Sequence, residues 1–383
     1  MANKKWLSIY IHIPFCIKKC LYCDFISGPA TSEVQEAYVD ELVREIEKAS
    51  SKYQDRIVRT VFFGGGTPSL LTCEQMTRII GCLQKSYHME QCEEITIEVN
   101  PATADENKLQ CYWMLGINRL SIGLQSTHGY ELELLGRIHT YEQFLMTYRQ
   151  ARKVGFANIN IDLMAAIPSQ TIDSYKETLE RVCELHPEHI SAYSLIIEEG
   201  TLFYDLYGEH LDTAMPHPIT HTIEELLSEE EERQLYEMTE CILGQHGYYR
   251  YEISNYAQVG NYCDSTQYEC KHNNVYWQRG NYVGFGTSAA SLVDSYRFRV
   301  GEEPVLLTRQ EQMEEYMYLG LRRMQGVSRE TFHSEFGIEI EEVYGPILTQ
   351  LEENQLVLVS KEWVALTKKG IDLSNYVLAQ FLL

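Results

Sequence analysis

The sequence predicts an α/β protein in which a parallel sheet curls toward a closed or partial barrel, followed by a smaller domain of helices and a β-hairpin. Six short runs rich in β-branched residues alternate with stretches of helical periodicity, which is typical of a parallel sheet with crossover helices. The chain has 383 residues, enough for one large domain and a smaller one. After about residue 305 the alternation stops, and helical stretches lead into two short strands.

The strands and helices of the first half follow from local patterns. Thr171 and Asp173 open one helix, which carries Tyr175, Leu179 and Val182 on a single face. Right-handed crossovers between parallel strands bend such a sheet toward a barrel. Strands are expected at residues 7–13, 57–63, 94–99, 119–124, 158–163 and 189–195.

The second half is less regular. Residues 203–231 are rich in Pro, His and Glu, and they predict a surface insertion that ends in a capping box from Ser228 to Glu231, before another helix. The segments LVLVS and EWVALT predict the hairpin of a small winged-helix-like domain, which we interpret as a packing lid or protein contact rather than a nucleic-acid binder. The expected domains are 1–203, the barrel; 204–304, an insertion, a helix and a segment that packs on the barrel; and 305–383, the winged-helix-like domain.

Charge and composition narrow the function classes. The chain has 32 Lys and Arg against 55 Asp and Glu, a formal charge of -23, and such a surface repels a phosphate backbone. No apolar run approaches the length of about 20 residues that a membrane span needs, and no secretion signal is recognisable. We therefore expect a cytoplasmic protein that is neither an integral membrane protein nor a nucleic-acid binder. Its 11 cysteines are expected to be thiols, available for metal or cluster ligation.

Three cysteines, Cys16, Cys20 and Cys23, follow directly after the first expected strand. The carboxyl ends of the strands are where α/β barrels place their chemistry. A 4Fe-4S cluster normally takes four thiolates, so three on one loop would leave one iron open. An open iron can chelate the amino nitrogen and carboxylate of S-adenosylmethionine and support its cleavage to a 5'-deoxyadenosyl radical. The alternatives are a zinc site completed by His12, or three unrelated buried thiols.

The stretch IYIHIPFCIKKCLYCDF resembles the signature of radical S-adenosylmethionine (radical SAM) enzymes. The form is that of oxygen-independent coproporphyrinogen III oxidases and HemW-type heme chaperones, and the resemblance runs from about residue 7 to residue 380. It implies an α/β fold with a partial (β/α)6 barrel and a carboxyl-terminal helical and winged-helix-like region. It also implies a 4Fe-4S cluster on Cys16, Cys20 and Cys23, with S-adenosylmethionine at the open iron.

The same resemblance assigns further contacts to the cofactor. The GGGTPS segment at residues 64–69 resembles the family's GGT motif, whose backbone contacts the amino group of the methionine moiety. Arg137 is suited to pair with the cofactor carboxylate, while Glu98 and Asp162 offer acceptors for ammonium or ribose hydroxyl groups. Ala166 departs from the family pattern, which usually has a glycine there. The residues assigned to the cofactor are Tyr10, Gly65, Gly66, Thr67, Glu98, Gln125, Arg137 and Asp162.

Two segments separate the oxidases from the chaperones. Oxidases carry CxxxCxxCxC, whereas this chain has Phe25 at the position of the fourth cysteine, as the HemW-type sequences do. The segment KHNNVYW resembles the HNxxYW motif of the chaperones, so His272 is a candidate heme ligand flanked by Tyr276 and Trp277. The alternative is that both aromatic residues anchor a loop in the core and that His272 is a satisfied polar residue. The preceding link, around residues 261–267, is lengthened relative to the family, which affects the expected geometry of a heme site.

These resemblances imply a heme-binding protein that carries heme as cargo and delivers it to a membrane-associated or respiratory acceptor. A reductant such as flavodoxin or ferredoxin would supply electrons to the cluster. One alternative is an oxidase that decarboxylates propionate groups of coproporphyrinogen III, which Phe25 disfavours. The other is a radical enzyme with an unrelated substrate, because folds of this kind host many reactions.

Overall fold

The computed structural model describes residues 5–208, 225–260 and 264–383. Its main sheet has 12 strands in the order β12-β11-β10-β9-β1-β2-β3-β4-β5-β6-β8-β7. The six strands predicted from the sequence form the consecutive parallel core of this sheet, and in the described residues the sheet curls without closing into a complete barrel. Their bounds are β1 (Trp6–Ile13), β2 (Ile57–Gly65), β3 (Glu94–Val99), β4 (Arg119–Gln125), β5 (Ile159–Ala165) and β6 (His189–Ser194).

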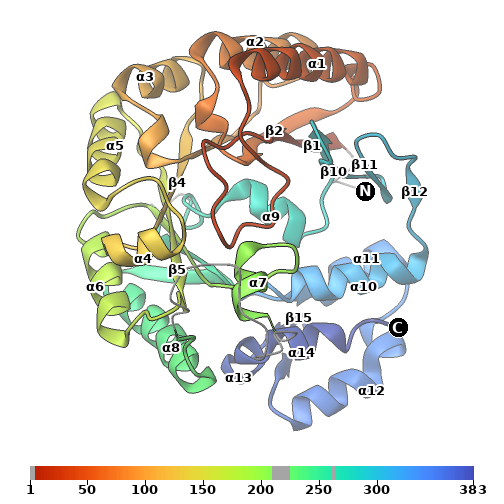
Figure 1. Cartoon of the computed structure of the whole chain (residues 1–383). Coiled ribbons are helices and arrows are strands. Elements are labelled where there is room, and N and C mark those ends of the chain that lie inside the picture. The colour runs from red at the N-terminus through yellow and green to blue at the C-terminus, as the bar shows by residue number, and fades with distance from the viewer. Residues whose placement is uncertain (1–4, 209–224, 261–263) are drawn as a thin grey trace.

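Helices cover the outer face of this sheet (Figure 1). Most begin at a Thr, Ser or Asp whose side chain accepts a hydrogen bond from a backbone N–H in the first turn, including the predicted capping box from Ser228 to Glu231. Between strands lie α1 (Ser32–Ser50), α2 (Cys73–Ser86), α3 (Glu106–Met114), α4 (Gly129–Leu134), α5 (Tyr141–Val154) and α6 (Ile172–Cys183), with the short 3-10 helices η2 (Pro68–Leu70) and η3 (Pro101–Thr103). After β6 come α7 (Leu202–Tyr207) and α8 (Glu229–Gln245).

The strand registers bring the predicted site residues together at one edge. Ile13 of β1 lies opposite Gly65 of β2, so the cysteine loop and the glycine turn leave the sheet side by side. Gly123 of β4 lies opposite Asp162 of β5. Because side chains alternate between the two faces of a strand, residues two apart on these strands point into the same space inside the curve.

The middle of the chain extends the sheet at both edges, which the sequence analysis did not predict. The hairpin of β7 (Tyr248–Glu252) and β8 (Asn255–Gln258) pairs antiparallel with β6. On the other edge β9 (Tyr282–Phe285) pairs parallel with β1, and β10 (Ala290–Val293), β11 (Tyr296–Arg299) and β12 (Val305–Leu306) follow antiparallel. Between them α9 (Lys271–Trp277) lies inside the curve of the sheet (Figure 1).

Residues after 308 form the predicted winged-helix-like unit with its own core, which includes Met317, Phe332 and Tyr344. A three-stranded sheet in the order β13-β15-β14 supplies the wing. The elements are α10 (Arg309–Gly320), β13 (Val327–Ser328), α11 (Arg329–Phe336), α12 (Ile340–Glu353), β14 (Val357–Val359), β15 (Trp363–Leu366), α13 (Lys368–Asp372) and α14 (Ser374–Ala379).

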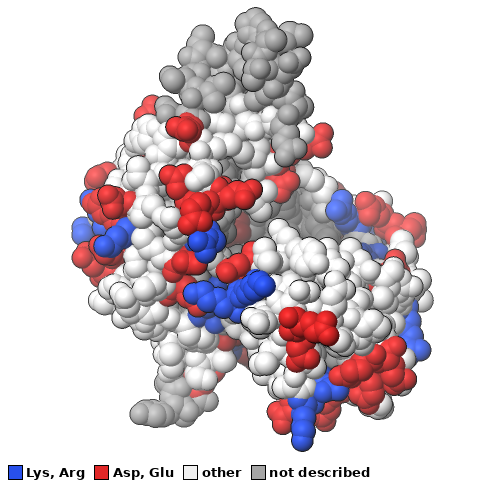
Figure 2. All heavy atoms as spheres, turned by 90° about the horizontal axis from the view of Figure 1, so that it is seen from below, with Lys and Arg blue, Asp and Glu red and all other residues white. Residues whose placement is uncertain are grey.

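Two ion pairs of the buried Glu315 join this unit to the segment from α9 to β11. Glu315 of α10 accepts a hydrogen bond from Arg279 at 3.0 Å and pairs with Arg297 at 2.9 Å. Figure 2 shows acidic side chains spread over the face seen from below, with basic side chains in small groups among them. Within the described ranges, no helix combines the length and apolar character that a membrane crossing requires.

Candidate cofactor-binding site

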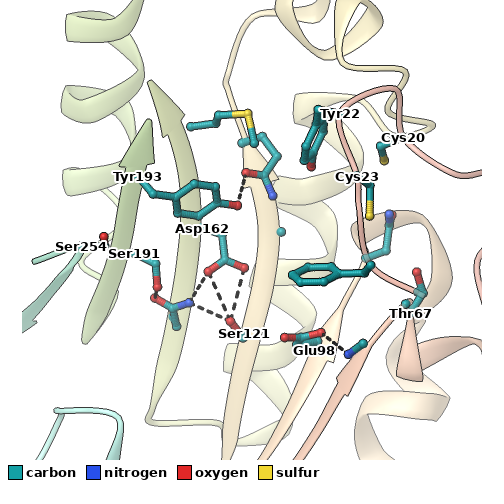
Figure 3. A pocket seen from close by; sticks show the side chains of 18 of the residues that line it. Cys20, Tyr22, Cys23, Thr67, Glu98, Ser121, Asp162, Ser191, Tyr193 and Ser254 are labelled. Atoms are coloured by element: carbon teal, nitrogen blue, oxygen red, sulfur yellow. Dashed lines mark hydrogen bonds between the residues drawn. The ribbon is translucent and has the colours of Figure 1, made fainter. Parts of the chain in front are cut away.

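A cavity of about 580 Å³ lies inside the curve of the sheet and opens beside the loop that follows β1. Its walls come from β1 to β6, from the cysteine loop and from α9, and Figure 3 shows several of these side chains converging on one space. The volume falls within the range of small-molecule and cofactor sites. All but one of the predicted site residues line it: Tyr10, Cys16, Cys20, Cys23, Gly65, Gly66, Thr67, Glu98, Gln125, Arg137, Asp162, His272 and Tyr276.

The cysteine loop is fixed at several points by backbone hydrogen bonds. The Cys16 N–H donates to the Gly28 carbonyl at 3.0 Å, which closes the loop on itself. The Leu21 N–H donates to the Leu135 carbonyl at 3.1 Å, which ties the loop to the segment after α4. These bonds hold the three partly exposed thiols at the cavity, and burial raises the pKa of the Cys23 thiol.

Two polar side chains approach the thiols. The Thr67 hydroxyl donates to the Cys16 sulfur at 3.6 Å, and Nη1 of Arg137 donates to the Cys20 sulfur at 3.6 Å. Hydrogen bonds from such donors stabilise the thiolate form, which is the form that ligates iron. Thr67 and Arg137 thus lie where they can hydrogen-bond to two of the three sulfurs.

The arrangement of the cysteines differs from that of a single-ion site. Within the described residues, no three His, Cys, Asp or Glu side chains are grouped as ligands of one metal ion would be. Such grouping is not required for a 4Fe-4S cluster, because each thiolate binds a different iron. His12, considered above as a fourth zinc ligand, has both ring nitrogens in hydrogen bonds, one to the Tyr10 hydroxyl and one to the Ile26 carbonyl.

The glycine turn is required by close packing against the end of β1. Gly65 has a φ of +112°, and a Cβ there would lie 2.5 Å from the His12 ring. A Cβ on Gly66 would lie 2.7 Å from the Phe15 carbonyl oxygen. Only glycine allows this approach, so the turn places the Gly65 and Gly66 backbone directly beside the cysteine loop.

Two carboxyl groups face the cavity from neighbouring strands. The Gly65 N–H donates to Glu98 at 3.1 Å (Figure 3). Burial, together with the charge of Asp162, raises the pKa of Glu98 to about 8 despite this bond. Asp162 accepts a hydrogen bond from Asn160 at 2.7 Å and others from Ser121, yet burial still raises its pKa. A cationic ligand bound beside these two groups would favour their ionised forms.

Arg137 and Gln125 line the cavity near the carboxyl end of β4. Nη2 of Arg137 donates to the Gly123 carbonyl at 2.6 Å, while its Nε is buried without a hydrogen-bond partner. Gln125 has a φ of 73° and accepts a hydrogen bond from the Tyr193 hydroxyl at 2.9 Å (Figure 3). Ala166 adopts a left-handed φ of 60°, the conformation that favours the glycine usual in the family.

Of the three residues of the predicted heme motif, His272 and Tyr276 line the cavity, whereas Trp277 lies outside it. His272 is 1% exposed, with Nδ1 bonded to the Thr60 hydroxyl and Nε2 to the Tyr276 hydroxyl, both at 2.8 Å. Burial, followed by the charge of Arg119, lowers its pKa to about 3. Trp277 is not among the cavity residues, and its ring stacks instead under the guanidinium of Arg322 at 4.4 Å. Of the lengthened link, residues 261–263, including Cys263, lie outside the described residues.

His272→Ala is expected to destabilise the fold by about 2–3 kcal/mol, because two buried hydroxyl groups lose a partner and a cavity remains. A neutral buried histidine also makes the folded state bind fewer protons than the unfolded state between pH 6.5 and about 3. Stability therefore falls as the pH drops through this window, and less steeply in the variant. Urea unfolding at several pH values measures both effects.

The matched control is His333→Ala on α11, since that side chain is 56% exposed and pairs only with Glu339. Its effect should stay within about 0.5 kcal/mol. Equal stabilities of the two variants would contradict a structural role for His272.

Sequence reasoning missed several polar residues that also line the cavity. The sequence pattern that could have identified them is the alternation of residues along two strands. On β4, Arg119, Ser121 and Gly123 precede Gln125 at intervals of two, and on β5 Asn160 precedes Asp162 by two. Period-two polar positions on otherwise apolar strands indicate a shared polar face. The missed lining residues include Arg119, Ser121, Asn160, Ser191, Tyr193 and Ser254.

A parallel α/β sheet whose carboxyl edge presents three loop cysteines beside a GGT turn defines the radical SAM class. The Radical SAM superfamily model matches residues 10–182, and the HemN C-terminal domain model matches residues 307–373. Heme chaperone HemW of Lactococcus lactis is 33% identical, with 98% of this chain and 97% of that protein covered. Heme chaperone HemW of Bacillus subtilis is also 33% identical, with 98% and 99% covered. The chain therefore belongs to the radical SAM superfamily and, within it, to the HemW family.

The fold has a solved counterpart. The structure of coproporphyrinogen III oxidase HemN from Escherichia coli superposes with a TM-score of 0.81, covering 99% of this chain and 91% of that one. At 23% sequence identity this likeness establishes the fold. The predicted fold class, a radical SAM α/β domain with an additional carboxyl-terminal domain, is thereby confirmed.

Proposed function

We propose that this chain is a cytoplasmic radical SAM heme chaperone, which carries a 4Fe-4S cluster and S-adenosylmethionine and binds heme as cargo for a membrane-associated or respiratory acceptor. The observation that carries the proposal is the common cavity of the cysteine loop, the GGT turn and Arg137, in a chain related over its full length to proteins named heme chaperone.

The residues present fit the cluster and its ligand. Cys16, Cys20 and Cys23 would hold three irons, leaving the fourth for S-adenosylmethionine. When bound, the cluster would supply the electron that breaks a carbon–sulfur bond of S-adenosylmethionine. The chain's own contribution is binding and orientation: Thr67 and Arg137 donate hydrogen bonds to two of the sulfurs.

We assign S-adenosylmethionine to the part of the cavity beside the cysteine loop, between Arg137 and the glycine turn. Arg137 would pair with its carboxylate, and the backbone of Gly65 and Gly66 would contact its amino group, with Glu98 as an acceptor. Asp162 would accept from ribose hydroxyl groups. Tyr10, Thr67 and Gln125 complete the assigned set.

Heme cargo is supported by the family and by Phe25, which lines the cavity and is 61% exposed. Heme ligation by His272 would require Nε2 to release the Tyr276 hydroxyl. Tyr276 could then flank the porphyrin, whereas Trp277 would first have to leave Arg322. We therefore propose His272 as the axial ligand of a rearranged, heme-loaded form.

The test is anaerobic reconstitution of the cluster followed by two assays on the same preparation. Adding hemin should give a saturable shift of the Soret band, and the band position should differ in His272→Ala because the axial ligand has changed. Coproporphyrinogen III should not be converted to protoporphyrinogen. If heme did not bind saturably, the proposed chaperone function would be refuted. If coproporphyrinogen III were converted, the protein would instead be an oxidase. An identical Soret band in the variant would refute His272 as the ligand.

A further inference from the structure

The inner end of the cavity holds a buried cation, the guanidinium group of Arg119. Arg119 is the first residue of β4, it is 2% exposed, and it lines the cavity. Its Nε is buried without a hydrogen-bond partner. In the part of the chain that the structure describes, no carboxylate lies within ion-pair distance of its guanidinium. A buried cation with no carboxylate in direct contact is costly, so this position is suited to an anionic ligand.

The nearest carboxyl groups are occupied by other donors. Glu94 accepts the N–H groups of Lys271 and His272, both at 3.0 Å, and so caps the start of α9. Asp162 accepts hydrogen bonds from Asn160 and Ser121. Both charges lie near Arg119, but neither carboxyl group hydrogen-bonds to its guanidinium, which lines the cavity.

Arg119 and Arg137 approach the cavity at different levels of β4. Nη2 of Arg137 lies on the Gly123 carbonyl, and Gly123 is four residues further along β4 than Arg119. Four residues of strand span about 13 Å. A carboxylate held by Arg137 therefore leaves the Arg119 end of the cavity for a second anionic group.

We propose that Arg119 binds a carboxylate at the closed end of the cavity, and that this carboxylate is a propionate of a tetrapyrrole. The proposal rests on the heme function proposed above, which supplies a ligand with two propionates. The surroundings suit the group: Ser121 and Asn160 also line the cavity and add neutral polar contacts. An arginine fork matches a carboxylate with two parallel hydrogen bonds.

The test compares hemin with hemin dimethyl ester on the anaerobic, cluster-reconstituted protein, by Soret titration. The wild type should bind hemin at least about tenfold more tightly than the ester, as expected for the loss of one charge-assisted pair. Arg119→Gln should bind both forms with equal affinity, and Arg119→Lys should keep part of the preference. Arg56→Gln is the matched control, because Arg56 is buried, pairs with Asp294 and lies outside the cavity. It should retain the wild-type preference.

The outcomes separate this site from the function on which it rests. Equal binding of both hemin forms by the wild type, or an unchanged preference in Arg119→Gln, would refute the propionate site and leave heme binding intact. Absence of binding of either form would refute the heme function and the tetrapyrrole assignment together. Calorimetry with S-adenosylmethionine should give affinities within about twofold for wild type and Arg119→Gln. A tenfold loss there would assign Arg119 to the methionine carboxylate instead.

Discussion

Cys20→Ala is expected to abolish the brown chromophore and the cleavage of S-adenosylmethionine together. Cys20 supplies one of only three protein thiolates proposed for the cluster, and alanine leaves a second iron without a protein ligand. The substitution also removes the acceptor of the hydrogen bond from Arg137. Iron analysis and the visible spectrum after anaerobic reconstitution measure cluster loss, and detection of 5'-deoxyadenosine measures cleavage.

The control for this prediction is a cysteine elsewhere on the surface. Cys241 lies exposed on α8 and outside the cavity, so Cys241→Ala should keep the iron content and chromophore of the wild type. If Cys20→Ala retained a full cluster and cleaved the cofactor at the wild-type rate, the three-cysteine site would be wrong.

The barrel strands were predictable because most of them are short runs rich in β-branched residues and are buried on both faces. β5, for example, has buried Ile159, Ile161 and Leu163 in a run that contains the polar Asn160 and Asp162. Such runs are local and need no knowledge of partners. Strands β9 to β12 were missed because they have two to four residues each and depend on pairing with β1 or with one another.

The positions of the cysteine loop and the glycine turn in the fold were predictable from their spacing relative to the strands. The cysteine loop and the glycine turn each follow a strand, and the register of β1 with β2 then brings them together. The orientation of α9 was not predictable, because seven residues carry too little periodicity to show which face is buried. His272 and Tyr276, four residues apart, share the inward face, while Trp277 turns toward the carboxyl-terminal unit.

Arg137→Met is expected to weaken binding of S-adenosylmethionine by about 30- to 100-fold, the equivalent of about 2–3 kcal/mol for a lost charge-assisted contact. Methionine keeps much of the side-chain volume, so the change removes charge and hydrogen bonds more than packing. Arg137→Lys should recover only part of the affinity, because an ammonium cannot present two parallel donors to a carboxylate. Calorimetry on the reconstituted protein measures all three affinities.

The interpretation requires that the cluster itself survive, since Arg137 also contacts Cys20. Iron content must therefore match the wild type in every variant compared. Arg152→Met on α5 is the matched control: that arginine is also partly buried, but it pairs with Glu188 at 2.9 Å away from the cavity and should leave the affinity unchanged. If Arg137→Met bound the cofactor within twofold of the wild type with a full cluster, the carboxylate would lie elsewhere. Arg119, the other arginine of the cavity, would then be its receptor, and the propionate site would have to be abandoned as well.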